Sequence, residues 1–171
     1  MLLTACSDFA AGNSGAPQHG FTLVELVMVL VLAGVLAVFA APRLFNTSDF
    51  NARGFQDETL SLLRFAQKTA IAQRRTVCVT FAGTSGASLT IASAPSVFTC
   101  NTALRGPKGD SPATVTAKAG VAYSAVPTSF NFDGLGQPVN TSGTQVATQT
   151  IQVGNAANAT TVEAVTGYVH E

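Results

Sequence analysis

The sequence predicts an α+β protein: a long apolar helix, a second, amphipathic helix, and a mostly antiparallel β-domain on which the second helix packs. Three observations predict this class. Residues 21–41 are apolar apart from one ionisable side chain, apolar residues return at helical spacing up to residue 75, and from residue 76 onward they alternate with period two.

The composition excludes several classes of function. Of the 171 residues, 47% are apolar and only 11% are charged, about half the charged share of ordinary globular chains. Nine basic and nine acidic residues leave no bulk charge to attract nucleic acid or anionic lipid. The histidines, His19 and His170, lie too near the ends for a Ser/His/Asp or Cys/His arrangement or a zinc cluster. We therefore expect a non-enzymatic protein with no catalytic residue, cofactor or metal.

The apolar block is expected to span a membrane. As a helix, residues 21–41 rise about 31 Å, close to the hydrocarbon thickness of a bilayer. The block is too long for a secretory signal, and no Ala-x-Ala-like site ends it. A carboxylate is unfavourable in hydrocarbon, so the presence of Glu25 in such a span requires an explanation. Glu25 could lie in the headgroup zone, in the first helical turn, where the helix N-terminus favours an acid. Pro42 removes one helical hydrogen bond, which predicts a kink there.

The segment 43–75 is predicted to be an amphipathic helix, weakened at 46–49 and at 53–54, with its clear helical spacing starting at about Phe55. Its buried stripe is expected to pack on a sheet, while Arg64, Lys68 and Arg74 lie on a solvated face. The stripe consists of Phe55, Thr59, Leu62, Leu63, Ala66 and Ala70, with Leu60 and Ile71 beside it.

The segment 76–171 is predicted to be the β-domain. Strand candidates are residues 76–81, 88–92, 113–117, 120–124, 129–132, 145–153, 161–165 and 168–169, and residues 101–112 form a long exposed loop.

Residues 19–26 (HGFTLVEL) resemble the class III signal of type IV prepilins and type II secretion pseudopilins. The resemblance implies a pilin-like fold and a leader, residues 1–20, that prepilin peptidase removes by cutting after Gly20. It also implies methylation of the new amine of Phe21 and makes Glu25 the fifth residue of the mature chain. Unlike such leaders, residues 1–20 contain no Lys or Arg; either His19 and the peptidase suffice, or the true start lies elsewhere.

Further runs resemble a narrower group. Residues 55–79, 130–138 and 166–169 are similar to the GspH/FimT family of minor pseudopilins, and the first run is most like an MshC-type minor pilin of mannose-sensitive haemagglutinin (MSHA) pili. The resemblance implies a minor subunit of a type IV pilus or type II secretion pseudopilus that initiates or caps assembly. It implies a bacterial inner-membrane protein with a single span and a periplasmic C-terminal domain, and the partners are prepilin peptidase, other pilin subunits and the assembly platform.

Cleavage after Gly20 would remove Cys6 and leave Cys78 and Cys100 as the remaining thiols. In an oxidising compartment this even pair predicts one disulfide.

Two alternatives stay open. A tip subunit could use its loops for adhesion or, through Arg74, Arg75, Arg105, Lys108 and Lys118, for DNA; the lack of interleaved aromatic residues disfavours nucleic acid. A generic single-pass envelope protein would not be processed at Gly20.

Overall fold

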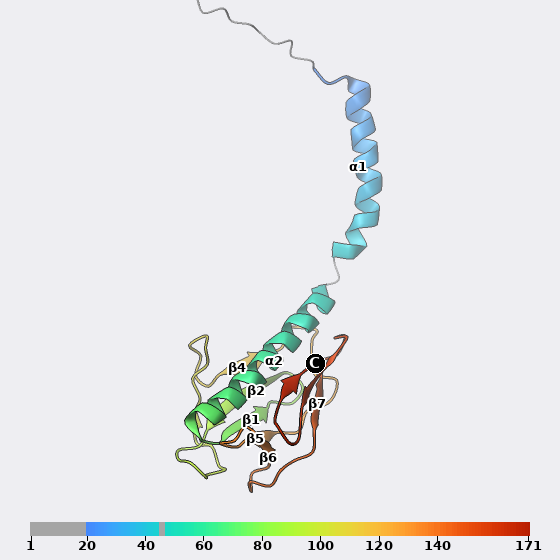
Figure 1. The fold of residues 1–171 in the computed structure, drawn as a ribbon. Helices are drawn as coiled ribbons and strands as arrows, with labels where there is room; N and C mark the ends of the chain where they lie inside the picture. Colours follow the sequence, from blue (N-terminus) through green and yellow to red (C-terminus); the bar gives the residue numbers. More distant parts are fainter. Residues whose placement is uncertain (1–19, 45–46) are drawn as a thin grey trace, which may run out of the picture. The chain divides into compact units, whose positions relative to one another are not determined.

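The computed structural model describes residues 20–44 and 47–171, with side chains for 20–37 and 48–171. The chain divides into two compact units, Met1–Phe45 (unit 1) and Asn46–Glu171 (unit 2). The described part of unit 1 holds helix α1 (Leu23–Leu44), and that of unit 2 holds helix α2 (Thr47–Gln73) and nine short strands (Figure 1). The predicted α+β class is confirmed.

Helix α2 buries the predicted stripe. Every member of it is at most 9% exposed, whereas Ile71 is 47% exposed. Within the predicted segment 43–75, the helix begins at Thr47, before the clear helical spacing at Phe55, and continues through Gly54. Two features offset the cost of a helical glycine, about 1 kcal/mol: Ala52 is fully buried and extends the stripe by one turn, and Asp49 in the first turn complements the helix dipole.

The C-terminal end of α2 is closed by its backbone. Arg74 has a positive φ of 49°, its N–H donates to the carbonyl of Ile71 at 3.3 Å, and the N–H of Arg75 donates to that of Ala70 at 3.2 Å. These are the two hydrogen bonds of a Schellman motif, in which glycine usually takes the left-handed position. Arg74 and Arg75 therefore follow the helix and do not belong to its last turn.

The larger sheet is antiparallel, with the order β3-β2-β1-β5-β6, and β4 also pairs with β2. At its centre, Val79 of β1 lies opposite Leu89 of β2 and Phe130 of β5, and all three side chains are buried. The strands are β1 (Val77–Phe81), β2 (Gly86–Ile91), β3 (Thr102–Ala103), β4 (Thr114–Thr116), β5 (Phe130–Phe132) and β6 (Pro138–Val139).

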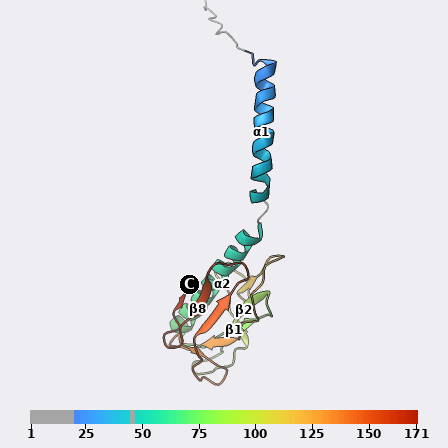
Figure 2. The same cartoon turned by 90° about the vertical axis from the view of Figure 1, so that its right-hand side faces the viewer.

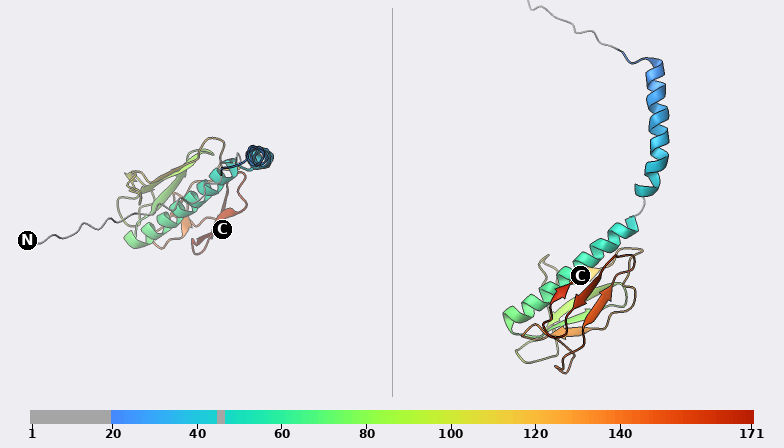
Figure 3. Two further views of the ribbon diagram at one scale, coloured as in Figure 1. Left: turned by 90° about the horizontal axis from the view of Figure 1, so that it is seen from above. Right: turned by 45° about the vertical axis from the view of Figure 1, so that its right-hand side comes forward.

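The smaller sheet has the order β7-β8-β9 and is also antiparallel. Its strands are β7 (Gln149–Gln152), β8 (Ala159–Val162) and β9 (Val169–His170). Helix α2 contacts β1, β4 and β5 of the larger sheet and β8 and β9 of the smaller one. Figures 2 and 3 show the helix lying along both sheets, so that one helix closes the core of unit 2.

One predicted strand was wrong, and two short strands were missed. Residues 120–124 form no strand and contribute only a bridge between Tyr123 and Val153. The loop predicted at 101–112 contains β3, and β6 was not predicted because a strand that starts with Pro138 is a weak candidate. Both missed strands have two residues, which is too short for a period to show.

Tyr123 nevertheless lies at the centre of the core. Its ring packs 4.8 Å from that of Phe55 and 5.6 Å from that of Phe81, and its hydroxyl shares a 3.0 Å hydrogen bond with that of Thr59. Burial raises the pKa of the Tyr123 hydroxyl, and the hydrogen bond to Thr59 opposes that rise in part. Thr59, the polar residue in the predicted stripe, therefore provides a hydrogen-bond partner for the Tyr123 hydroxyl, the polar atom of this aromatic cluster.

Candidate functional site

The N-terminal end of α1 is capped by Thr22. Its Oγ1 accepts a hydrogen bond from the backbone N–H of Glu25 at 3.2 Å, and its carbonyl accepts one from Leu26 at 3.1 Å. A Thr followed three residues later by Glu is the pattern of a capping box, a signal that the sequence analysis missed. The geometry places Glu25 in the first helical turn, where the dipole favours a carboxylate.

The described side chains of α1 are exposed and apolar on every face of the helix. Phe21 and Leu23 are 81% and 78% exposed, and the aliphatic residues that follow are about half exposed or more. A helix that is apolar all round is normally buried in a membrane or among other helices.

Within the part of the chain that the structure describes, no helix is both long enough and apolar enough to cross a membrane. The span predicted for residues 21–42 stays a prediction. Backbone of α1 continues through Pro42, whose side chain lies outside the described residues, so the kink also stays a prediction.

Cys78 and Cys100 form a disulfide with their Cα atoms 6.0 Å apart. Cys78 lies on the opposite face of β1 from the buried Val77, Val79 and Phe81, so the bridge fastens the segment after β2 to the outer face of the sheet. The bond closes 22 residues of sequence, and a loop of that size corresponds to about 3 kcal/mol of stabilisation.

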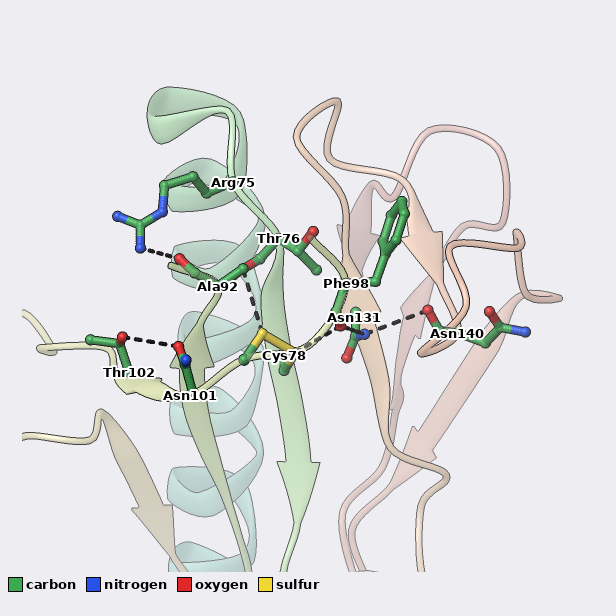
Figure 4. Close-up of a disulfide and its surroundings, with 10 residues drawn as sticks. Arg75, Thr76, Cys78, Ala92, Phe98, Asn101, Thr102, Asn131 and Asn140 are labelled. Carbon is green, nitrogen blue, oxygen red and sulfur yellow. Dashed lines mark hydrogen bonds between the residues drawn. A yellow bond between two sulfur atoms is a disulfide. The ribbon is translucent and has the colours of Figure 1, made fainter. Parts of the chain in front are cut away.

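A buried amide beside the disulfide holds the same segment. Asn131 of β5 is 4% exposed, and its Nδ2 donates to the carbonyl of Phe98 at 3.1 Å and to that of Asn140 at 3.5 Å. Figure 4 shows Asn131 between these two carbonyls, close to Cys78. The segment that precedes Cys100 is thus tied to the sheet by both a covalent bond and a side-chain amide.

Two side chains of α2 fasten the C-terminal hairpin, which the sequence did not suggest. Arg64, expected on a solvated face, donates from Nε to the carbonyl of Val169 at 3.0 Å. Gln67 donates from Nε2 to the carbonyls of Thr166 at 3.1 Å and Gly136 at 3.4 Å. The helix therefore joins the turn before β6 to the turn before β9.

The basic residues proposed for DNA do not gather on one face. Lys108 forms an ion pair with Glu58 at 3.2 Å, and Lys118 lines a small hollow beside the same acid. Arg74 follows the other end of α2, about 24 Å further along the helix axis. Arg75 donates to the carbonyl of Ala92 (Figure 4). Lys108 and Lys118 thus lie near one end of α2 and Arg74 and Arg75 near the other, which disfavours the DNA-binding alternative.

No group of three or more His, Cys, Asp and Glu side chains within the described residues is arranged to hold a metal ion. His170 instead pairs with Glu163, its Nε2 lying 3.0 Å from the carboxylate Oε1.

Comparison with known proteins adds three findings. Residues 16–41 match the family described as the prokaryotic N-terminal methylation motif. A 44-residue stretch is 41% identical to type II secretion system core protein G of Pectobacterium carotovorum subsp. carotovorum, covering 26% of this chain and 28% of that protein. A 90-residue stretch is 32% identical to PilA5, the major component of the type IV narrow pilus of Thermus thermophilus, covering 48% of this chain and 78% of that one.

Among solved structures, the type IV minor pilin FimU of Pseudomonas aeruginosa matches with a TM-score of 0.46 and 14% identity, over 69% of this chain and 85% of that one.

Proposed function

This chain belongs to the type IV pilin and pseudopilin superfamily, and from that membership we propose that it is a minor, non-enzymatic subunit of a type IV pilus or a type II secretion pseudopilus. We further propose that it initiates or caps filament assembly, with an MSHA-like pilus as the specific machine. The observation that carries the proposal is the methylation motif at residues 16–41, most of which lies in helix α1, whose described faces are apolar apart from Glu25.

The apolar helix supplies the physical mechanism. Before assembly it would lie in the inner membrane, with unit 2 in the periplasm. On assembly it would leave lipid for a bundle of similar helices, so that its apolar side chains never meet water. Leucine and valine side chains alone would leave the axial register of such a bundle loose, because dispersion contacts between them are similar at many offsets.

Glu25 and Phe21 would fix that register. We propose that the carboxylate of Glu25 on one subunit pairs with the methylated, positively charged amine of Phe21 on its neighbour. Each charge alone among packed apolar helices would cost several kcal/mol, and pairing removes most of both costs. The exposure of Phe21 and the place of Glu25 in the first turn of α1 support this pairing.

Processing at Gly20 gives the direct test. A glycine at the cut site lets a protease approach the backbone closely, and a side chain there would obstruct it. We expect wild-type chain from membranes to begin at methylated Phe21, and Gly20→Val to keep its leader. Intact-mass measurement of the extracted protein checks both.

Gly34→Val is the matched control, because a Cβ at Gly34 would meet no atom within 4 Å and the substitution keeps α1 apolar. This variant should be cleaved normally. A wild-type chain that retains its leader residues in the membrane extract would contradict the proposal and favour a generic envelope protein.

A further inference from the structure

A hollow of about 230 Å³ lies within unit 2, beside the first half of α2. Its lining comes from α2, from the segment between β7 and β8, and from the residue that follows β9, namely Arg53, Gln56 and Asp57, residues 156–158, and Glu171. The hollow is smaller than the sites that hold drug-sized ligands, so its size suits a single side chain or a small organic ion.

Gln56 brings to this hollow a buried acceptor that lacks a donor. The residue is 4% exposed, and its Oε1 has no hydrogen-bond partner among the described residues. An unpaired buried polar atom is destabilising, and an apolar side chain of similar shape would avoid that cost. The terminal torsion of a glutamine is soft, so rotation of the amide can present Oε1 to the hollow that Gln56 lines. A hydrogen-bond donor in the hollow would supply the missing bond.

The charged side chains that line the hollow do not neutralise one another. They are the guanidinium of Arg53 and the carboxylates of Asp57 and Glu171, which leave one negative charge in excess. The ion pairs found among the described residues involve none of these three side chains. A ligand with a single positive charge therefore complements the hollow.

The set of acceptors favours an ammonium group as that ligand. Oε1 of Gln56 and the carboxylates of Asp57 and Glu171 belong to three separate residues, and an ammonium has three N–H donors. A guanidinium prefers the two oxygens of one carboxylate. A divalent metal ion would need about six oxygens, and the described residues hold no metal-binding group. The small side chains of Ala156 and Ala157 leave room for the aliphatic stem of a lysine.

We propose that this hollow binds the ammonium group of a lysine on a neighbouring pilin subunit. Asp57 and Glu171 are exposed, so the contact is weak by itself. Between subunits that are already held in one filament, the effective concentration of the lysine is high enough for the contact to form. The inference rests on the proposed function, because it needs adjacent subunits, and it deepens that function by giving unit 2 a contact of its own.

A titration of the purified chain tests the site without a filament. The full-length, processed protein in detergent micelles is isotope-labelled and titrated with Nα-acetyl-lysine methylamide, and its backbone amides are followed by NMR. We expect the amide signals of residues 156–158 and Glu171 to shift. The same probe acetylated at Nε is neutral and should bind at least about tenfold more weakly, because a hydrogen bond to a charged group is the stronger one.

Substitutions around the hollow separate its parts. Asp57→Asn and Glu171→Gln should each weaken binding of the lysine probe by up to about fivefold, the range of an exposed ion pair. Gln56→Leu should weaken it about tenfold and leave the thermal stability equal or higher, because the unpaired acceptor is gone. Glu58→Gln is the matched control: Glu58 follows Asp57 on α2, does not line this hollow, and pairs with Lys108, so binding should not change.

Arg53→Gln removes the competing cation and should strengthen binding of the lysine probe. Equal binding of the charged and the neutral probe, or full binding by Gln56→Leu, would overturn the site. Weaker binding by Arg53→Gln would overturn the charge assignment on which the ammonium ligand depends.

Carbodiimide cross-linking of sheared filaments tests the partner. The reagent joins a carboxylate to an amine in contact with it, so mass spectrometry should find Asp57 or Glu171 linked to a lysine of another subunit. Gln56→Leu keeps both carboxylates and should lower the yield of this link. The pair of Lys108 and Glu58, at 3.2 Å, should give a link within the chain and serves as the control for the reagent.

The two experiments distinguish failure of the inference from failure of the proposed function. The internal link without the link between subunits, in filaments that contain the chain, would overturn the neighbouring lysine as the partner. A purified chain that does not bind the lysine probe would overturn the site alone. Absence of the processed chain from filaments would overturn the proposed function, and the partner with it.

Discussion

The amide of Asn131 shows how one side chain holds a segment that has no regular secondary structure. Because Nδ2 of Asn131 donates to the part-buried carbonyls of Phe98 and Asn140, Asn131→Ala would leave both without that donor. We expect the variant to lower the free energy of unfolding by about 1–3 kcal/mol in denaturant titrations. Asn101→Ala, at an exposed position nearby, should change it by less than about 0.5 kcal/mol. Equal effects of the two substitutions would contradict this role.

His170 gives a second prediction at the residue scale, one that depends on pH. The pKa of its imidazole is raised above the ordinary 6.5, mainly by the hydrogen bond to Glu163 and then by the backbone carbonyl of Glu171, while desolvation and Arg64 oppose the rise. A raised folded-state pKa means that protonated His170 stabilises the fold fully below about pH 6.5. This contribution is lost as pH rises through the raised value.

Proton NMR can follow this titration cleanly, since cleavage after Gly20 would remove His19 and leave His170 as the single histidine. We expect Glu163→Gln to lower the titration midpoint toward 6.5, the ordinary value. Glu58→Gln, which removes an acid paired with Lys108 instead, should not move it. A midpoint that is unchanged by Glu163→Gln would show that the ion pair does not form in solution.

At the scale of elements, the spacing of apolar residues predicted the elements that bury one face over several consecutive turns or residues. The stripe of α2 and the alternating strands β1 and β2 follow from residue spacing, because each buries one face over several residues. The single bridge made by Tyr123 depends on Val153, which is distant in the sequence. Strands β3 and β6 have only two residues each, so alternation of apolar and polar residues cannot reveal them.

The bonds from α2 to the C-terminal hairpin were missed for a related reason. Arg64 and Gln67 look like surface residues because they are polar and lie outside the apolar stripe of α2. Their partners are backbone carbonyls, which every residue has, so no residue type at Val169 or Thr166 marks the pairing. The disulfide was predictable because only two thiols would remain after the proposed cleavage.

The turn before β9 yields a prediction at this scale. Gly167 has a φ of 64°, and a Cβ there would lie in contact with the carbonyl oxygen of Gly136, far closer than a real Cβ approaches. Gly120 also has a positive φ, 83°, but a Cβ there would meet nothing within 4 Å. Gly120→Ala should therefore cost only the backbone strain, about 1–2 kcal/mol.

Gly167→Ala should cost that strain plus the displacement of the turn, about 3 kcal/mol or more in thermal or denaturant unfolding. Because Gln67 bonds to both turns, the displacement should also loosen the C-terminal hairpin, which amide hydrogen exchange of β9 would report. Similar losses in the two variants would mean that the turns do not touch as described.

For the whole molecule, the two units have different physical requirements. Unit 2 is a conventional domain with its own buried core, stabilised further by a disulfide. Unit 1 contributes a helix whose described apolar side chains are all exposed, so its stable environment must come from lipid or from other subunits. Membership of the superfamily could be predicted from eight residues, 19–26, because their combination is so specific. The machine that the subunit serves is not encoded in any one motif.

Glu25 allows the assembly proposal to be tested at the scale of the filament. Glu25→Leu makes the apolar helix more apolar, so the variant should enter the membrane and should still be cleaved after Gly20. In the filament, the amine of Phe21 on a neighbouring subunit would lose its counter-charge, and an uncompensated buried charge costs about 3–5 kcal/mol. Since each 1.4 kcal/mol corresponds to a factor of ten, incorporation into filaments should fall at least about tenfold.

Thr22→Val is the control that keeps the charge and removes only the cap whose hydroxyl accepts the N–H of Glu25. Losing a cap costs about 1 kcal/mol, at a helix end that neighbouring subunits would also hold, so incorporation should fall far less than for Glu25→Leu. Cells that carry each variant are fractionated, and the processed protein is quantified in membranes and in sheared filaments. If Glu25→Leu enters filaments at the wild-type level while filament number is normal, the carboxylate is only a shallow polar residue at the membrane surface. If incorporation of Thr22→Val into filaments falls as far as that of Glu25→Leu, then assembly depends on the conformation of the N-terminal end of α1 and not on the charge of Glu25.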